Sequence, residues 1–462
     1  MYHQNKKHRR SELMSKNVAK AYSGRWVAHE VPKDTIPEDS LDPRATYLLI
    51  HDEMNLDSNP SLNLASFVTT WMEDEAEKVI IESLNKNYID EDEYPQTRII
   101  HDRVIKMLGN MCNSSESAGT ATIGSSEAIM LALLAHKWNW RKNRQAEGKD
   151  TSNPNIVFGA DVHSCWEKFA LYFDVEMRII PLTEDKYTIN ANDIANYVDE
   201  NTIAVGAVLG TTFTGQIDDF IGINKYLLKL KKEKGLDIPI HVDAASGGFV
   251  AAFAFPDLKW DFRLEQVKSI NISNHKYGLV YVGMGTVLFR NKEVIPEELI
   301  FHINYLGGSM PNYSLNFSKP SAMVIAQYYN FLRLGQSGYR NIIGNVLNVA
   351  RYVEEKLIET GKFRILTDCN YLPVTAVCLK DSSKYNVFQI SKRLHEYGWV
   401  VPAYTLPPNA EHLAVLRIVC RERFTLDMAE NFIEDIYKVI SELEEESNPI
   451  SSNTTNSNSR VC

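Results

Sequence analysis

The middle of the chain, from about residue 125 to residue 290, alternates between helical and extended patterns. Ser125–Arg141 is rich in Ala, Leu and Met at helical spacing, and Phe220–Lys234 is a second helical stretch. Short apolar segments of strand length, bounded by glycine or polar residues, surround these helices. Because strands that are apolar on both faces suit a sheet covered by helices on both sides, the pattern predicts an α/β fold with a mostly parallel sheet. The expected strands are Asn155–Gly159, Arg178–Leu182, Ile203–Leu209, Ile238–Val242, Ser269–Ser273 and Gly285–Arg290.

The chain changes character after about Asn341. Its last helical stretch carries apolar residues at helical spacing from Phe432 to Leu443. An earlier amphipathic stretch and two short apolar segments precede it, so the pattern predicts a smaller C-terminal α+β domain. The expected elements are helices at Ile342–Ile358 and Leu426–Leu443, and strands at Thr375–Lys380 and Leu413–Val419.

The two ends of the chain differ from its middle. The first 60 or so residues show little helical or strand periodicity. The last 16 residues, SNPISSNTTNSNSRVC, are polar and of low complexity, which predicts disorder. The expected division is an N-terminal segment at 1–60, a large domain at 61–340, a small C-terminal domain at 341–446 and a disordered tail at 447–462.

Charge and composition restrict the classes of function. The net charge is 49 − 59 = −10, which argues against general nucleic-acid binding, because such binding needs a basic face. No stretch reaches the ~18 apolar residues of a membrane span, and the basic N-terminus has no apolar segment behind it, so we expect no secretory signal. The six cysteines include no C-x-x-C pair, which predicts a reducing compartment and no zinc or disulfide framework.

Asp243 stands at the end of an expected strand and is followed by the small residues of Ala244–Gly248. Ligands of parallel sheets bind beyond the carboxyl ends of the strands. A carboxylate at this place can hold a cationic nitrogen, and small neighbours let a flat ring approach closely. The alternative interpretation is an ordinary aspartate at a strand-to-loop turn.

Lys276 follows the next expected strand, 33 positions after Asp243 (276 − 243), and is flanked by His275 and Gly278. Partial burial lowers the pKa of an ammonium group, and a neutral amine can condense with an aldehyde. A Schiff-base lysine together with an aspartate that faces a pyridinium nitrogen is what pyridoxal phosphate requires. Lys276 alone could equally be a surface or salt-bridged lysine, but the two residues on successive strands favour this cofactor.

A phosphate site is expected beside these two residues. The segment Gly119–Glu127 (GTATIGSSE) precedes a long helix, and it ends in the hydroxyls of Ser125 and Ser126. Free amides at a helix start can hold an anion together with such hydroxyls. A plain helix N-cap, which serine often supplies, is the alternative.

Eight segments carry a resemblance to the glutamate decarboxylases, which belong to the group II pyridoxal-phosphate-dependent decarboxylases. The resemblance extends from about residue 22 to residue 445. It implies the aspartate-aminotransferase (type I) fold. The matching segments are LNLASF (Leu62–Phe67), NKNYIDEDEYPQ (Asn85–Gln96), GTATIGSSEA (Gly119–Ala128), CWEKFALYF (Cys165–Phe173), HVDAASGGF (His241–Phe249), HKYGLVYVG (His275–Gly283), NYLGG (Asn304–Gly308) and LRIVCRERF (Leu416–Phe424).

The resemblance assigns cofactor contacts by position. Lys276 is similar to the Schiff-base lysine and Asp243 to the pyridinium partner. Ala245 and His163 are expected against the cofactor ring, and Thr212 is expected at a further cofactor contact. The implied phosphate contacts are Ser125, Ser126, Ser273 and His275, with Ser318 reaching the phosphate of a neighbouring subunit.

The resemblance also assigns substrate contacts. Arg417 is similar to the anchor of the α-carboxylate, a task that suits a guanidinium because it can donate two parallel hydrogen bonds; a surface ion pair is the alternative. Tyr305 lies on a segment that resembles a mobile catalytic loop, with a plain surface turn as the alternative. The positions that match those holding the distal carboxylate are Ser66, Phe67, Asn87 and Asp90.

The activity that the resemblance implies is decarboxylation of L-glutamate to 4-aminobutanoate and carbon dioxide, with pyridoxal 5'-phosphate as cofactor. The family forms homodimers or larger homo-oligomers, and we expect a cytoplasmic enzyme without a metal, nucleic-acid or membrane partner. Calmodulin binding is not expected, because the tail lacks the Trp- and Lys-rich segment of the plant enzymes.

Several positions depart from the family pattern and leave alternatives open. His163 stands where bacterial and plant glutamate decarboxylases carry Gln, although other group II decarboxylases use His there. Ser66 replaces Thr, Asn274 replaces Gly and Thr286 replaces Trp. The open alternatives are decarboxylation of aspartate or cysteine sulfinate, a different pyridoxal-phosphate reaction such as aldehyde-lyase cleavage or transamination, and a non-catalytic protein on this fold.

Overall fold

The computed structural model describes residues 33–183, 185–303, 310–367 and 371–447. The chain divides into two compact units, Met1–Asn59 and Pro60–Cys462. In the first unit, helix α2 (Pro43–Met54) occupies a stretch for which the sequence predicted little regular structure. The carboxylate of Asp42 caps it by accepting hydrogen bonds from the amides of Arg44 and Ala45 at 3.0 and 3.1 Å. The predicted tail at 447–462 lies outside the described residues except for Ser447, which ends a helix.

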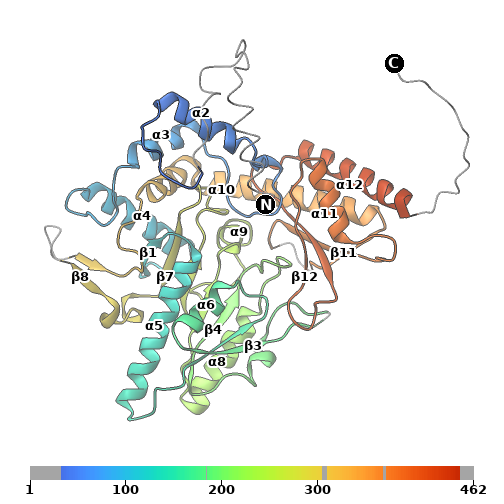
Figure 1. The fold of residues 1–462 in the computed structure, drawn as a ribbon. Helices are drawn as coiled ribbons and strands as arrows, with labels where there is room; N and C mark the ends of the chain where they lie inside the picture. The colour runs from blue at the N-terminus through green and yellow to red at the C-terminus, as the bar shows by residue number, and fades with distance from the viewer. Residues whose placement is uncertain (1–32, 184, 304–309, 368–370, 448–462) are drawn as a thin grey trace, which may run out of the picture. The chain divides into compact units, whose positions relative to one another are not determined.

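The second unit contains a seven-stranded mixed sheet in the order β1-β7-β6-β5-β4-β2-β3 (Figure 1). The pairs β3–β2, β2–β4, β4–β5 and β5–β6 are parallel, whereas β7 runs antiparallel to both of its neighbours. All six predicted strands exist, with ends shifted by at most a few residues. Strand β1 was not predicted. The strands are β1 (Ala118–Thr122), β2 (Asn155–Gly159), β3 (Glu176–Ile180), β4 (Thr202–Val208), β5 (Ile240–Asp243), β6 (Val267–Ile272) and β7 (Gly285–Phe289).

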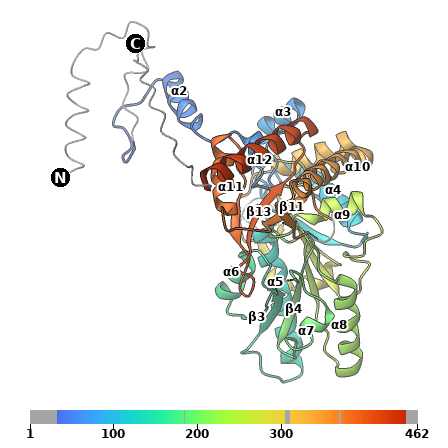
Figure 2. The same cartoon turned by 90° about the vertical axis from the view of Figure 1, so that its right-hand side faces the viewer.

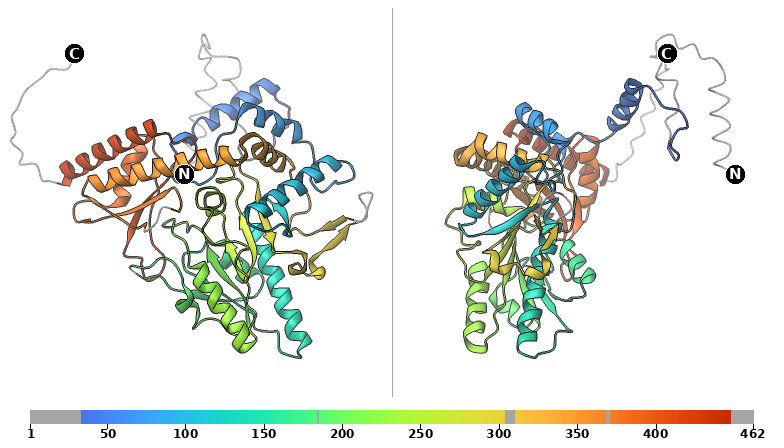
Figure 3. Two further views of the ribbon diagram at one scale, coloured as in Figure 1. Left: turned by 180° about the vertical axis from the view of Figure 1, so that it is seen from behind. Right: turned by 90° about the vertical axis from the view of Figure 1, so that its left-hand side faces the viewer.

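Helices cover both faces of this sheet, as its continuous apolar strands require. Consecutive β4 residues belong to different core clusters: Ala204 packs with Ile129 of α5 (Ser125–Ala146), and Val205 packs with Leu227 of α8 (Phe220–Lys234). Because successive side chains of a strand point to opposite faces, α5 and α8 lie on opposite sides of the sheet. Figure 3 (right) shows this arrangement, with the teal α5 and the yellow-green α8 on either side.

A smaller antiparallel sheet in the order β10-β11-β13-β12 forms the C-terminal part of this unit (Figure 2). Its strands are β10 (Phe363–Ile365), β11 (Val374–Leu379), β12 (Ala403–Thr405) and β13 (Ala414–Val419). Helices α11 (Val387–Glu396) and α12 (Leu426–Ser447) pack on each other, and α12 also contacts α10 (Ala322–Glu359). The predicted boundary at 340/341 falls inside α10, five residues after Gly335, whose φ of 56° and ψ of −170° interrupt the helix.

The remaining elements connect these two sheets or extend them. No helix among the described residues is long and apolar enough to cross a bilayer. These elements are α3 (Asp74–Ser83), α4 (Pro95–Met111), α6 (Cys165–Tyr172), α7 (Ala191–Ile194), α9 (Gly247–Ala254), the strand pair β8 (Phe301–Ile303) and β9 (Met310–Asn312), and the 3-10 turns η2 (Pro60–Leu62), η3 (Lys292–Val294) and η4 (Glu297–Leu299).

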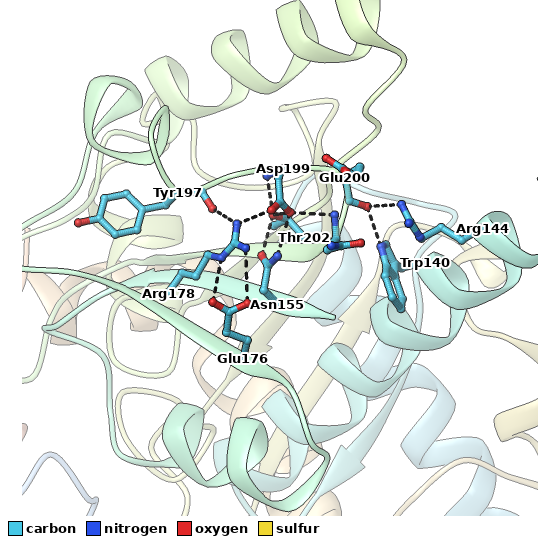
Figure 4. A network of polar contacts seen from close by, with 10 residues as sticks. Trp140, Arg144, Asn155, Glu176, Arg178, Tyr197, Asp199, Glu200 and Thr202 are labelled. Carbon is cyan, nitrogen blue, oxygen red and sulfur yellow. Dashed lines mark hydrogen bonds and ion pairs between the residues drawn. The ribbon is translucent and has the colours of Figure 1, made fainter. Parts of the chain in front are cut away.

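A polar network closes the end of the sheet that carries the strand N-termini (Figure 4). Asp199 accepts a hydrogen bond from Asn155 of β2 at 2.9 Å and forms an ion pair with Arg178 of β3 at 2.7 Å. Although partial burial opposes it, these contacts hold the pKa of Asp199 below its usual value. Thr202 of β4 donates a hydrogen bond to Asn155 at 2.8 Å. Three neighbouring strands are therefore joined at the end opposite to the one where ligands of parallel sheets bind.

Two departures from the family pattern form a buried pair with each other. Thr286 donates a hydrogen bond to the amide oxygen of Asn274 at 2.7 Å, and the amide nitrogen of Asn274 donates to Gln327 at 3.0 Å. Neither Asn274 nor Thr286 has any exposed surface. The buried amide oxygen of Asn274 thus has its partner in the hydroxyl of Thr286.

We expect Thr286→Val to lower the free energy of unfolding by about 1–3 kcal/mol, because it leaves the buried amide oxygen of Asn274 without a partner. Denaturant unfolding of Thr286→Val, of Asn274→Ala and of the double variant measures the coupling between the two side chains. Losses that simply add in the double variant would contradict the pairing.

Candidate active site

A buried pocket of about 170 Å³ lies where β4, β5 and β6 end and α5 begins. This is the edge at which ligands of parallel sheets bind. Nine of the ten residues predicted to contact a cofactor line it together, from segments more than 150 positions apart. They are Ser125, Ser126, His163, Thr212, Asp243, Ala245, Ser273, His275 and Lys276.

Lys276 projects into this pocket from the turn after β6. Its Nζ donates a hydrogen bond to the hydroxyl of Ser246 at 2.9 Å and lies 5.1 Å from the centroid of the Phe67 ring. Burial lowers the pKa of the Lys276 ammonium, although the charge of Asp243 acts in the opposite direction. A larger fraction of neutral amine is therefore available than on a solvated lysine, as condensation with an aldehyde requires.

Asp243 is the last residue of β5, and it is almost completely buried. Its Oδ1 accepts hydrogen bonds from the side-chain amide of Asn271 at 2.9 Å and from the backbone amide of Ala245 at 3.1 Å. Its Oδ2 accepts one from the indole of Trp166 at 3.0 Å. Three hydrogen-bond donors therefore hold the carboxylate of Asp243 in a single orientation.

The start of α5 forms the other end of the pocket. The hydroxyls of Ser125 and Ser273 lie 2.7 Å apart, and the first amides of α5 have no partner within the helix. The Nδ1 atom of His275 is buried and without a hydrogen-bond partner, and burial with the nearby charge of Lys276 lowers the pKa of His275 to about 4. Hydroxyls, helix amides and an orphaned ring nitrogen suit a phosphate group, so the pocket fits a phosphorylated aldehyde.

His163 lies between these two ends, at the turn before α6. Its Nδ1 accepts a hydrogen bond from the backbone amide of Cys165 at 3.3 Å, and burial lowers the pKa of His163. A neutral imidazole can stack on an aromatic ring without bringing a charge into the pocket.

Arg417 reaches the same region from β13 of the smaller sheet. Its two terminal nitrogens donate to the backbone oxygens of Thr212 at 2.5 Å and Ala65 at 2.7 Å. Its guanidinium carbon lies 5.2 Å from the centroid of the Phe67 ring and 5.6 Å from that of Tyr404. The Nε atom of Arg417 is buried without a partner. Backbone contacts thus hold the guanidinium near two aromatic rings, and its Nε–H is left for a ligand.

The other residues predicted to contact the substrate lie in several different segments of the chain. Ser66 accepts a hydrogen bond from the amide of Val68 at 3.1 Å, next to Phe67. Asn87 donates one to Ser318 at 3.4 Å. The described residues that line the pocket include neither Ser318 nor the predicted substrate residues Ser66, Phe67, Asn87, Asp90 and Arg417. Tyr305 lies outside the described residues.

Four further residues belong to the site and were not singled out from the sequence. Ser246 holds the amine of Lys276, and Trp166 and Asn271 hold Asp243. Asp161, two residues after β2, lines the pocket with both carboxylate oxygens buried and unpartnered, and burial raises its pKa. Trp166 and Ser246 lie within the segments that carry the family resemblance; Asn271 and Asp161 lie outside them.

Comparison with known proteins agrees with this geometry. Residues 37–380 match the family model of the pyridoxal-dependent decarboxylase conserved domain. A glutamate decarboxylase of Solanum lycopersicum is 51% identical over 428 residues, which cover 92% of this chain and 85% of the relative. A glutamate decarboxylase of Aliivibrio fischeri is 44% identical over 436 residues, covering 92% of this chain and 94% of the relative.

Solved structures give the same result for the fold. The structure of a Lactobacillus brevis glutamate decarboxylase superposes with a TM-score of 0.88 at 41% identity, covering 91% of this chain and 97% of that one. A sphingosine-1-phosphate lyase of Burkholderia pseudomallei shares the fold at 18% identity, with a TM-score of 0.76. The predicted type I fold is thereby confirmed. The chain belongs to the pyridoxal-dependent decarboxylase family.

Proposed function

We propose that this protein decarboxylates L-glutamate to 4-aminobutanoate and carbon dioxide with pyridoxal 5'-phosphate as cofactor. The observation that carries the proposal is that Lys276 and Asp243 line one buried pocket, and that Arg417 donates a hydrogen bond to the backbone oxygen of Thr212, which lines the same pocket. Relatives named glutamate decarboxylase, at 43–52% identity over most of the chain, support the substrate.

In this proposal the residues that line the pocket bind the different parts of the cofactor. When bound, pyridoxal phosphate supplies a sink for the electron pair that the departing carbon dioxide leaves on Cα. Asp243 holds a proton on the ring nitrogen through its carboxylate. The hydroxyls of Ser125, Ser126 and Ser273, the helix amides and His275 bind the phosphate. Ala245, His163 and Thr212 line the same pocket, and they would contact the ring of the bound cofactor.

Lys276 and Arg417 act on the substrate side. The Lys276 Nζ and the Arg417 guanidinium lie 5.1 and 5.2 Å from the same Phe67 ring, so both are within reach of one small amino acid. The free Nε–H of Arg417 orients the α-carboxylate. Lys276 holds the cofactor aldehyde between turnovers and is placed to return a proton to Cα; Tyr305, on a segment outside the described residues, is the second candidate for that proton.

We expect Arg417→Ala to raise the KM for glutamate roughly 10- to 100-fold, because a charge-assisted hydrogen bond to the carboxylate is lost. The smaller sheet presents Arg417 through backbone contacts, so Arg417→Lys should recover only part of the loss: an ammonium cannot reproduce the planar donor set. Steady-state kinetics of both variants measure this. An unchanged KM in Arg417→Ala would place the carboxylate elsewhere.

Selection for glutamate requires contacts to a second carboxylate. Ser66 and Phe67 lie beside Arg417, and we assign them to the distal end of the substrate. Asn87 and Ser318 are hydrogen-bonded to each other, Asp90 lies in the same segment as Asn87, and the resemblance implies that Ser318 reaches the phosphate of a neighbouring subunit. We assign these three residues to the site of a neighbouring subunit, so the active form is a homodimer or a larger homo-oligomer.

A substrate panel tests the proposal. The holoenzyme is incubated with L-glutamate, L-aspartate or cysteine sulfinate, each labelled in the α-carboxyl group, and both carbon dioxide and the amine product are identified. We expect labelled carbon dioxide and 4-aminobutanoate from glutamate. If labelled carbon dioxide were released only from aspartate or cysteine sulfinate, that amino acid would be the substrate instead. A product without an amino group would show that the enzyme catalyses a reaction other than decarboxylation.

We also assign the protein to the cytoplasm and expect no calmodulin, nucleic-acid or membrane partner. The buried thiols of Cys112, Cys165, Cys378 and Cys420 are free, as in a reducing compartment. Gel filtration with and without Ca²⁺-calmodulin measures the oligomeric state and tests whether calmodulin binds. A calcium-dependent shift of the elution volume would contradict the expectation that it does not bind.

A further inference from the structure

An unbroken chain of buried hydrogen bonds leads from Asp243, which lines the cofactor pocket, to His136 of α5, which does not. The parallel register of β5 and β6 places Asp243 beside Asn271 and His241 beside Ser269. Positions 241 and 243 share one face of β5, and positions 269 and 271 share the same face of β6, because side chains alternate along a strand. Four polar side chains therefore meet on one face of two buried neighbouring strands.

The distances make this a continuous series. The amide nitrogen of Asn271 lies 2.9 Å from Asp243, and its amide oxygen lies 2.9 Å from Nε2 of His241. Nδ1 of His241 lies 2.7 Å from the hydroxyl of Ser269. That hydroxyl lies 2.7 Å from Nε2 of His136, which projects from α5. Exposure is 2% at His136 and zero at Ser269, His241 and Asn271.

The carboxylate of Asp243 fixes the direction of every proton in the series. A carboxylate only accepts, so Asn271 must turn its NH₂ group toward Asp243 and its oxygen toward His241. Nε2 of His241 must then carry the hydrogen, which leaves Nδ1 bare to accept from Ser269. The oxygen of Ser269 in turn accepts from Nε2–H of His136. All donors thus point toward Asp243, and hydrogen bonds aligned in this way polarise one another.

Neither imidazole takes up a proton at neutral pH. Burial lowers the pKa of His136 to about 3, with the charges of His241 and Lys268 acting in the same direction. Burial lowers the pKa of His241 to about 4, against the opposing effects of the charge of Asp243 and of the hydrogen bond that His241 donates to Asn271. The indole of Trp166 packs against His241, with ring centroids 5.5 Å apart, while it donates to the second oxygen of Asp243. The series is therefore neutral except at its terminal carboxylate.

We propose that His136, Ser269, His241 and Asn271 are positioning residues that form a one-directional hydrogen-bond relay, and that this relay holds the carboxylate of Asp243 in the orientation in which it faces the ring nitrogen of the cofactor. The proposal rests on the proposed function of the pocket. The relay sets how firmly the cofactor ring holds its proton, and hence how well it accepts electrons, without touching substrate or cofactor.

The first test needs no substitution. In the holoenzyme labelled with ¹⁵N-histidine, long-range ¹H–¹⁵N spectra at pH 7 report the tautomer of each imidazole, and His241→Gln identifies the His241 signals. We expect His241 as the neutral Nε2–H tautomer. An Nδ1–H tautomer of His241 would reverse the direction of the series, and an imidazolium would break it at Ser269, so either result would overturn the proposal.

The second test removes a hydrogen-bonding side chain from the middle of the relay. Ser269→Ala removes the donor to His241 and the acceptor of His136. With pyridoxal phosphate carrying ¹⁵N in its ring, we expect the ring resonance to move toward the unprotonated position. We also expect kcat to fall roughly 3- to 10-fold, with little change in KM.

A matched control variant distinguishes the effect of interrupting the relay from a general effect of losing a buried hydroxyl. Thr202→Val removes another buried hydroxyl from the same sheet, whose partners Asn155 and Asp199 belong to the network of Figure 4 and not to the series at Asp243. It should leave the ring resonance and kcat unchanged. An unchanged ring resonance in Ser269→Ala, or an equal shift in both variants, would overturn the relay while leaving glutamate decarboxylation by the wild type intact. Failure of the wild type to bind the cofactor would instead overturn the proposed function.

Discussion

Lys276→Ala should retain the fold and lose at least about 10²–10⁴-fold in kcat, the range that a positioned proton-transfer group contributes. The amine of Lys276 is buried, held by Ser246 at 2.9 Å and shifted toward its neutral form. Its removal leaves no other lysine among the residues that line the pocket. Steady-state kinetics measure the loss, and circular dichroism checks the fold.

The control is a lysine that plays no part in the pocket. Lys231 forms ion pairs with Asp237 at 3.0 Å and Glu265 at 3.8 Å on the surface. Lys231→Ala should keep wild-type kcat and the absorption band of the bound aldehyde, which Lys276→Ala should lose. Normal turnover in Lys276→Ala would refute the role assigned to this residue.

Asp243→Ala should lower kcat by about 10²–10³-fold, comparable to the loss of a preorganised electrostatic contact in other enzymes. Without the carboxylate, no anionic side chain remains at the end of β5 to hold a proton on the ring nitrogen. The donors Trp166, Asn271 and Ala245 would also lose their shared acceptor. Kinetics at saturating cofactor distinguish weakened chemistry from weakened cofactor binding.

Asp261 offers a matched carboxylate outside the pocket. It is 1% exposed and forms an ion pair with Arg263 at 2.8 Å. Asp261→Asn should reduce stability and leave kcat near the wild-type value. If Asp243→Ala and Asp261→Asn reduced kcat equally, the effect at position 243 would be structural rather than electrostatic.

Much of the fold follows from local sequence patterns. Strand β2 and helix α8 have the predicted ends, because apolar runs and caps such as Asp219 and Gly235 are local signals; Asp219 caps the amide of Gly222, and Gly235 takes the left-handed φ of 73°. Strand β1 was missed, since its sequence AGTAT contains few large apolar residues and its pairing with β7 comes from a distant segment. The register between β5 and β6 is non-local for the same reason.

The residues of the site likewise divide into those that local sequence patterns predict and those that they do not. Asp243 and Lys276 stand at strand ends and could be recognised as a pair, whereas Arg417 and Phe67 were assigned by resemblance and are brought together by the tertiary fold. Asn271 and Ser269 left one local signal that was not used: polar residues alternate with apolar ones in His241–Asp243 and Ser269–Asn271, inside strands that are buried on both faces. Such alternation in a buried sheet indicates partners across the strands.

The most direct measurement is peptide mapping by mass spectrometry after the holoenzyme has been reduced with borohydride. The account predicts one pyridoxyl adduct, on the peptide that contains Lys276, and its absence from Lys276→Ala. An adduct on a different lysine in the wild type, or no adduct in an enzyme that still releases carbon dioxide from glutamate, would contradict it.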